Sequence, residues 1–314
     1  MTKVPTIKLS KDVSMPVFGL GTWNSPADEV KLAVRTALEA GYRHIDCALV
    51  YGNEKEIGEE LAQSMKKLNL KREDIFITTK LWCTHFRRDL VRKCCETSLK
   101  NLQIPYIDLY LVHWPVALKP GDELLPRTED GFHFAPDKVP LLETWKAMEE
   151  LVTAGLVKTI GVSNFNRRQL DLILKNCNIK PVNLQVEIHA NFMNSKLVDY
   201  ARSKGLTITA YSPLGSPAAA PGEVNLLTEP WVCEVAKRYN KSAAQVLLRL
   251  LLQLNIAVVP KSVTPSRIIS NFQVFDFTLK DEDVHTLSTK GLNQRQLVSK
   301  EMELSDEYPF KDEF

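Results

Sequence analysis

The segment Gly41-Tyr42-Arg43-His44-Ile45-Asp46-Cys47-Ala48-Leu49-Val50-Tyr51-Gly52-Asn53-Glu54 decides which fold the whole chain is expected to adopt. It starts with a glycine suited to the left-handed end of a helix. A short strand is predicted over residues 42–45, with Asp46 at its end and Tyr51 in the following loop. Repeating strand–helix folds carry their chemistry where strands end and loops begin. The segment therefore predicts a strand of an α/β fold and part of its functional site.

The same strand–helix pattern recurs along the chain. Helices are predicted after Ser25, with Ser25 as cap and Pro26 as first residue, near 54–67, 89–102, 140–153, 166–174, 195–203 and 243–254, and from Thr264-Pro265. Eight strands are predicted at 18–20, 42–45, 74–80, 106–113, 157–162, 182–186, 206–210 and 256–259. Short apolar strands between amphipathic helices indicate a parallel sheet covered on both sides. Eight such units favour a closed (β/α)₈ TIM barrel.

An open doubly wound sheet is the alternative architecture. Its only support is Gly19-Leu20-Gly21, a partial dinucleotide fingerprint whose third position is Asn24. We expect residues 1–314 to form a single barrel domain with an N-terminal hairpin over residues 7–18. Two loops, 114–139 and 212–229, and the C-terminal tail, 292–314, are too long to be plain connections. In a barrel the two loops would emerge at the catalytic face, and the tail would help to shape a substrate pocket.

Composition and net charge argue against several functional classes of protein. The 314 residues carry a net charge of +2, so no strong field points to nucleic acid or a membrane surface. No apolar run is long enough to span a bilayer, and the first residues lack the apolar core of a signal peptide. The six cysteines form no zinc-type or C-x-x-C pattern, so free thiols and no metal are expected. We expect a cytoplasmic monomer.

Four side chains are expected to converge at one rim of the barrel. Asp46, Lys80 and His113 end the second, third and fourth predicted strands, and Tyr51 follows the second. Neighbouring strands lie about 4.8 Å apart. A nearby ammonium lowers the pKa of a phenol, an aspartate fixes that ammonium, and a neutral histidine orients a polar oxygen. Each residue alone has an ordinary structural explanation. Together they predict a proton donor for a developing alkoxide.

Two further sets of residues suggest a phosphorylated ligand with a flat amide group. Thr264 is expected to cap a helix that starts at Pro265, and helix N-termini attract anions; Lys261, Ser262 and Arg267 add charge and a hydroxyl. A basic surface turn is the alternative. A second set of residues could bind an amide group and stack against its flat ring: Ser163, Asn164, Gln185, Tyr211 and Ser212. The alternative is that each of these is an ordinary residue at a strand end.

These motifs make the sequence resemble the aldo-keto reductase superfamily over essentially its whole length, and most of all the aldose and aldehyde reductase branch. That branch has a (β/α)₈ barrel and binds NADPH without a Rossmann domain. The resemblance rests on Asp46-Cys47-Ala48 with Tyr51 and Asn53-Glu54, Lys80-Leu81-Trp82, Leu111-Val112-His113-Trp114-Pro115, Gly161-Val162-Ser163-Asn164-Phe165, Tyr211-Ser212-Pro213-Leu214-Gly215 and Pro260-Lys261-Ser262.

The resemblance implies a role for each matched residue. Tyr51 would be the general acid, tuned by Lys80 and Asp46, with His113 directing the substrate carbonyl. The nicotinamide would stack on Tyr211, and the remaining cofactor contacts would come from Thr22, Trp23, Ser163, Asn164, Gln185, Ser212, Leu214, Ser216, Lys261, Ser262, Val263, Thr264, Arg267 and Asn271. An apolar substrate pocket would be lined by Trp23, Val50, Trp82 and Trp114.

Several positions depart from the family pattern and leave substrate choice open. They are Ser270, Leu49, Leu124-Leu125 and His189-Ala190-Asn191, the last in place of a usual His-Pro-Tyr. The leading hypothesis is an NADPH-dependent reductase of aldehydes and some ketones with a small-molecule carbonyl substrate. The alternatives are a non-catalytic relative, similar to a channel subunit or a lens crystallin, and a hydroxysteroid or prostaglandin dehydrogenase.

Overall fold

Parallel strands closed into a barrel form the centre of the molecule. The structure is a computed structural model that describes residues 4–216 and 225–312. In this part of the chain, eight strands pair in parallel in the order in which they occur, which confirms the predicted (β/α)₈ barrel. The strands are β3 (Leu20–Gly21), β4 (His44–Asp46), β5 (Phe76–Leu81), β6 (Ile107–Val112), β7 (Val157–Ser163), β8 (Asn183–Glu187), β9 (Thr207–Tyr211) and β10 (Ala257–Val258).

The first and last strands close the barrel through a small number of backbone contacts. The amide of Gly19 donates to the carbonyl of Val258, and the amide of Val258 donates to that of Val17, both at 2.9 Å. A second parallel contact joins Gly21 to Lys261. A Cβ atom on Gly21 would lie 2.6 Å from the carbonyl oxygen of Val259. Only glycine therefore allows the backbones to approach this closely.

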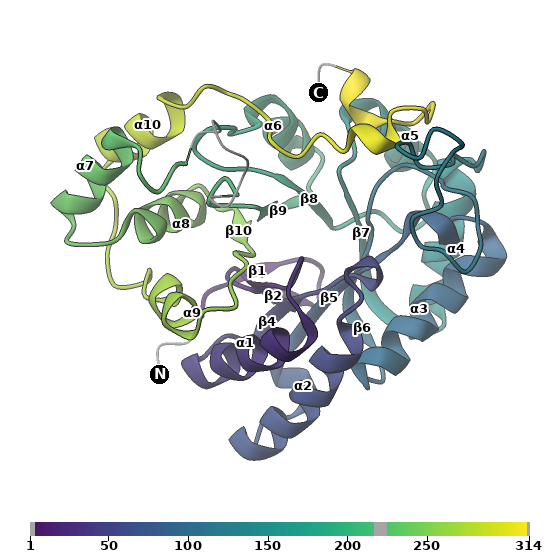
Figure 1. Cartoon of the computed structure of the whole chain (residues 1–314), viewed down its shortest axis with the longest axis horizontal. Helices are drawn as coiled ribbons and strands as arrows, with labels where there is room; N and C mark the ends of the chain where they lie inside the picture. The colour runs from purple at the N-terminus through teal and green to yellow at the C-terminus, as the bar shows by residue number, and fades with distance from the viewer. Residues whose placement is uncertain (1–3, 217–224, 313–314) are drawn as a thin grey trace.

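Helices surround the strands (Figure 1), and their bounds follow the predicted ones with three exceptions. Ser25 does not cap the first helix, because Pro26 has an extended ψ of 153° and no side chain caps the helix. Two helices, α7 and α10, were not predicted. The helices are α1 (Ala27–Ala40), α2 (Glu54–Leu68), α3 (Arg88–Leu102), α4 (Leu141–Thr153), α5 (Arg167–Asn176), α6 (Ser195–Ser203), α7 (Pro230–Arg238), α8 (Ala243–Gln253), α9 (Pro265–Phe272) and α10 (Asp281–Thr289).

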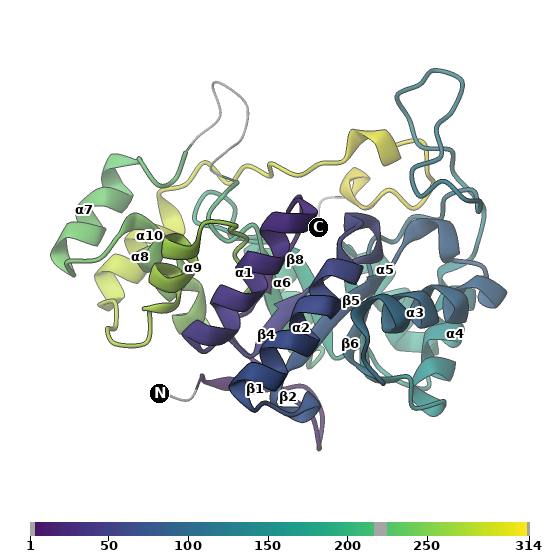
Figure 2. The same ribbon diagram turned by 60° about the horizontal axis from the view of Figure 1, so that its bottom comes forward.

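The two ends of the barrel differ in what covers them. The predicted hairpin, β1 (Thr6–Lys8) paired antiparallel with β2 (Ser14–Pro16), lies at one end. The loop over residues 114–139 and the C-terminal tail lie at the other, as Figure 2 shows. The loop contains no helix or strand, and the tail contains two short 3₁₀ turns, η4 (Lys300–Met302) and η5 (Pro309–Lys311). Of the segments named from the sequence, residues 1–3, 217–224 and 313–314 lie outside the described residues.

Two predictions about side chains can be compared with the structure: the apolar face of the first helix and the free cysteine thiols. Helix α1 buries the apolar face that its spacing predicted, from Val30 to Leu38. All six cysteines are free thiols; four are buried, and Cys177 and Cys233 are half-buried. Among the described residues, none of the helices has the length and apolar character needed to cross a bilayer.

Candidate active site

The structure brings the four predicted catalytic side chains to the end of the barrel that the long loop and the tail cover. Asp46 is the last residue of β4, Lys80 lies one residue before the end of β5, and His113 directly follows β6. Tyr51 ends a 3₁₀ turn, η1 (Leu49–Tyr51), that follows β4. Strands β4, β5 and β6 are consecutive neighbours in the sheet, so their last residues meet at one rim.

Lys80 and Asp46 form a buried ion pair at the centre of this rim. The Nζ atom of Lys80 donates to Asp46 Oδ1 at 2.6 Å and to the carbonyl of Cys47 at 2.8 Å. Gln185 Nε2 donates to the other carboxylate oxygen of Asp46 at 2.8 Å. Burial lowers the pKa of Lys80, but the charge of Asp46 and the hydrogen bond to it outweigh burial and raise it overall. The lysine is therefore charged at neutral pH.

Tyr51 lies beside this ammonium group. The Nζ atom of Lys80 is 5.3 Å from the centre of the Tyr51 ring, and the imidazole of His113 meets the same ring edge-on at 5.7 Å. Burial raises the pKa of Tyr51 to about 12, although the charge of Lys80 acts in the opposite direction. The lowered pKa that the sequence suggested is therefore not found, because burial of the phenol outweighs the ammonium. Tyr51 remains protonated at neutral pH.

His113 is held in its neutral form. Burial and the charge of Lys80 place its pKa well below the ordinary range. Its Nδ1 atom is buried and has no hydrogen-bond partner among the described residues, and its ring also meets Trp82 edge-on at 5.3 Å. A neutral imidazole can bind a polar substrate atom without adding a charge to the site.

The predicted amide-binding residues join the same network. Asn164, in the left-handed conformation at φ 62°, donates from Nδ2 to the carbonyl of His113 at 3.0 Å. Its Oδ1 atom accepts from the hydroxyl of Tyr211 at 2.7 Å. Ser163 ends β7 and is buried beside Asn164. The residues that the sequence placed in two separate sets thus form one group, connected through Asn164 and Gln185.

The loop that follows β9 continues from this group. Ser212 and Ser216 have positive φ angles of 47° and 43°, and the hydroxyl of Ser216 donates to that of Ser212 at 3.4 Å. Leu214 between them is half-buried. On the opposite side of the closure, Thr22 donates from its hydroxyl to the carbonyl of Asp46 at 2.8 Å.

The predicted anion site lies at the N-terminus of α9, next to the barrel closure. Thr264 is the residue that precedes the helix and Pro265 its first residue, as predicted, although the Thr264 side chain caps no amide. Lys261 and Arg267 are exposed and form no ion pair with a described residue. Two uncompensated cations beside a helix N-terminus suit a phosphate group. Ser262 accepts from the Thr264 amide, Val263 and Ser270 are half-buried, and Asn271 is buried on α9.

Two of the tryptophans predicted to line the substrate pocket contact the loop over residues 114–139 or the C-terminal tail. Trp82 donates from Nε1 to the carbonyl of Leu124 at 2.5 Å, and Trp114 meets Phe310 of the tail edge-on at 5.8 Å. Trp23 is half exposed at 50%. Sequence reasoning did not single out Phe310; its only signal was the aromatic pair in Tyr308-Pro309-Phe310. Val50 is half-buried within the turn that carries Tyr51.

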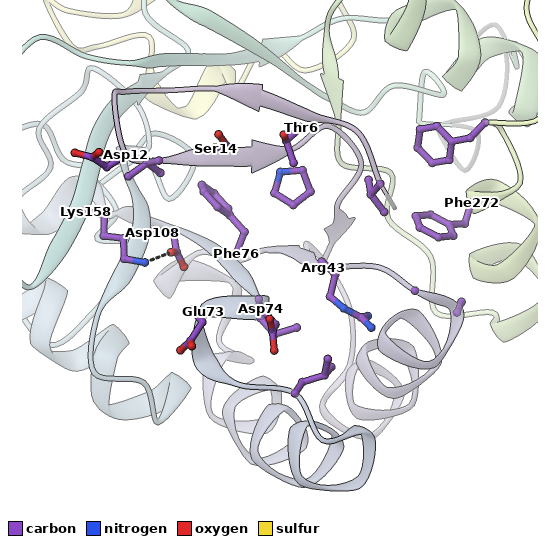
Figure 3. A pocket seen from close by; sticks show the side chains of 18 of the residues that line it. Thr6, Asp12, Ser14, Arg43, Glu73, Asp74, Phe76, Asp108, Lys158 and Phe272 are labelled. Atoms are coloured by element: carbon purple, nitrogen blue, oxygen red, sulfur yellow. Dashed lines mark hydrogen bonds and ion pairs between the residues drawn. The ribbon is translucent and has the colours of Figure 1, made fainter. Parts of the chain in front are cut away.

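A cavity of about 1490 Å³ lies at the other end of the barrel. It is lined by the hairpin and the first residues of the strands, among them Thr6, Ser14, Phe76, Asp108 and Lys158 (Figure 3). None of the predicted catalytic or cofactor-binding residues lines it. Active sites of (β/α)₈ barrel enzymes lie at the C-terminal ends of the strands, so the candidate site is the rim that carries Tyr51.

Comparisons with known proteins identify the family. The aldo/keto reductase family model matches residues 17–291. Aldo-keto reductase family 1 member A1-A of Danio rerio is 49% identical over 297 residues, covering 93% of this chain and 91% of its own. The Homo sapiens member A1 is 46% identical over 288 residues, covering 90% and 88%. The aldose reductase structure from Schistosoma japonicum is 57% identical, with a TM-score of 0.93 and full coverage of both chains. This chain therefore belongs to the aldo/keto reductase family, whose members are oxidoreductases of carbonyl compounds.

Proposed function

We propose that this protein is an NADPH-dependent carbonyl reductase that converts aldehydes and some ketones to alcohols, with Tyr51 as proton donor. The observation that carries the proposal is the arrangement of three side chains around one phenol. The Lys80 ammonium lies 5.3 Å from the Tyr51 ring centre, Asp46 holds that ammonium at 2.6 Å, and the His113 ring lies 5.7 Å from Tyr51.

Each side chain has a defined part in the proposed reaction. Neutral His113 binds the carbonyl oxygen of the substrate and directs it toward the hydroxyl of Tyr51. When bound beside Tyr211, NADPH would provide the hydride equivalent that reduction of the carbonyl carbon requires. As negative charge develops on the oxygen, Tyr51 transfers its proton there and becomes a phenolate, which Lys80 stabilises. Solvent then returns a proton to Tyr51, and the alcohol leaves.

The residues on the rim fit NADPH in their chemistry. Tyr211 offers an aromatic face, and Ser163, Asn164 and Gln185 bring hydroxyl and amide groups to its side. At α9, Lys261 and Arg267 offer two positive charges to the 2′-phosphate that distinguishes NADPH from NADH. The Lys261 backbone contacts Gly21, so this anion site adjoins the strand that leads to Thr22 and Trp23.

Replacing Tyr51 with phenylalanine tests the proton-donor role. The change removes one hydroxyl and keeps the ring that packs against His113. Loss of a general acid lowers turnover by about 10²- to 10⁴-fold, and NADPH should bind as before. The measurements are aldehyde-dependent NADPH consumption and a fluorescence titration of NADPH. Tyr106→Phe is the matched control, because Tyr106 lies at the opposite end of the barrel against Lys158. Wild-type turnover in Tyr51→Phe would refute the mechanism.

A further inference from the structure

The turn that follows β8 differs from the family pattern, and the structure shows what the changed residues contact. Asn191 is buried, at 2% exposure. Its side-chain Oδ1 accepts from the amide of Leu292 at 2.6 Å, and its backbone carbonyl accepts from the amide of Gln294 at 2.8 Å. One residue of the turn thus binds the start of the C-terminal tail twice, across a sequence separation of about a hundred residues.

Close packing between Gly291 and Ala190 supports the same contact between the tail and the turn after β8. A Cβ atom on Gly291 would lie 2.1 Å from the carbonyl oxygen of Ala190, a distance that only a glycine permits. Ala190 itself is buried, at 2% exposure. The tail therefore meets the turn backbone to backbone, directly before the two hydrogen bonds made by Asn191.

Glu187, the last residue of β8, binds the next part of the tail. Its buried carboxylate accepts from the amides of Gln296 and Leu297 at 2.8 and 2.9 Å and is 2.9 Å from Nε2 of His189. Burial raises the pKa of Glu187, but these hydrogen bonds outweigh burial and hold it below the ordinary value. Glu187 also pairs with Tyr211 across β8 and β9. The tail is thus attached to a strand of the active-site rim.

A chain of contacts leads from this attachment to the substrate wall. Arg295 lies between the two attachment points, and its guanidinium carbon is 4.5 Å from the centre of the Phe192 ring and 3.8 Å from that of Phe310. Phe310 in turn contacts Trp114 at 5.8 Å. In Figures 1 and 2 the tail, drawn in yellow, runs from α10 across the end of the barrel toward α5.

We propose that Asn191 is a positioning residue for substrate selection. Together with Glu187 it holds residues 291–297 in place. Through Arg295 and Phe310, this segment sets the position of Trp114, one of the residues predicted to line the substrate pocket. The inference rests on the proposed function and adds a residue that contacts neither cofactor nor substrate. It predicts that loosening the tail changes the discrimination between bulky and small aldehydes and leaves cofactor binding intact.

The test compares Asn191→Ala with wild type in the full chain. Hydrogen exchange of the amides of residues 292–297 should be roughly fivefold faster or more, as expected when one hydrogen bond is lost. The ratio of KM for a bulky aromatic aldehyde to KM for a short-chain aldehyde should shift by about 2- to 30-fold, the range for residues that act through packed neighbours. The affinity for NADPH should not change. Asn176→Ala is the matched control, since the Asn176 side chain donates to the carbonyl of Leu172 within α5 and to no other described residue.

A second variant approaches the same hydrogen bond from the other side. Leu292→Pro removes the amide hydrogen that Leu292 donates to Asn191 Oδ1. The Leu292 side chain is 68% exposed, so its replacement removes little from the core. The variant should reproduce both effects, with exchange measured at residues 293–297 because proline has no amide hydrogen. Unchanged exchange in both variants, or faster exchange with an unchanged KM ratio, would overturn the inference. An inactive wild type would refute the proposed function, whereas the exchange measurement would still decide whether Asn191 holds the tail.

Discussion

Variants of the Lys80–Asp46 ion pair allow its effect on folding stability to be measured separately from its effect on turnover. In Lys80→Met, the Asp46 carboxylate loses its partner at 2.6 Å, and the carbonyl of Cys47 loses its donor at 2.8 Å. Lys80 is 1% exposed and Asp46 is 3% exposed, so water cannot replace the lost partner. Among the described residues, the amide of Gln185 is then the one remaining donor to the carboxylate. Removing one member of a buried pair costs about 3–5 kcal/mol.

A double variant distinguishes the cost of the stranded charge from the loss of the ammonium. In Lys80→Met with Asp46→Asn, neither charge of the pair is left, and the asparagine oxygen can still accept from Gln185. Replacing both members of a buried pair is often nearly neutral, so most of the lost stability should return. Turnover should remain low in both variants, because the proposed mechanism needs the Lys80 charge to stabilise the Tyr51 phenolate.

Urea unfolding and NADPH consumption measure the two effects. Lys158→Met is the control for stability, since Lys158 is 39% exposed and pairs with Asp108 at 3.2 Å; it should cost less than about 1 kcal/mol. The reasoning fails if Lys80→Met is no less stable than this control. It also fails if the double variant recovers turnover together with stability.

Three further predictions concern the cofactor, pH and barrel closure. Arg267→Ala should weaken NADPH binding at least about tenfold and NADH binding little; equal losses in fluorescence titrations would contradict this. Burial lowers the pKa of His44 to about 4, so the unfolded chain takes up a proton first as the pH falls. The free energy of unfolding should therefore drop by about 3 kcal/mol between pH 6.5 and 4, a drop missing in His44→Gln when urea unfolding is repeated across that range. Gly21→Ala places a Cβ 2.6 Å from the Val259 carbonyl and should cost about 1–3 kcal/mol; an unchanged melting temperature would contradict this.

The positions of the candidate catalytic residues along the strands could be predicted, because strand positions follow from the local sequence pattern. Short apolar runs between amphipathic helices located β4, β5 and β6, and the parallel arrangement then placed Asp46, Lys80 and His113 at one rim. Helix α7 escaped prediction because it packs on α8 and interrupts the strand–helix alternation. Helix α10 packs against both of these helices.

Properties that depend on distant segments could not be predicted from local pattern. The pKa of Tyr51 is set mainly by how completely its surroundings enclose it, which no motif encodes. Likewise, the contact between Asn191 and the tail joins residues about a hundred positions apart. The departure at His189-Ala190-Asn191 was visible in the sequence, but its partner was not.

The hairpin beneath the barrel has a practical consequence. Its turn residues Lys11 and Asp12 are exposed, and the strands separate them from the rim that carries Tyr51. A dye, a surface linker or an affinity handle attached at this turn would leave the mouth of the barrel open to small molecules. Immobilised by this end, the protein presents its opposite face to the solution, which is the orientation a sensor surface for carbonyl compounds requires.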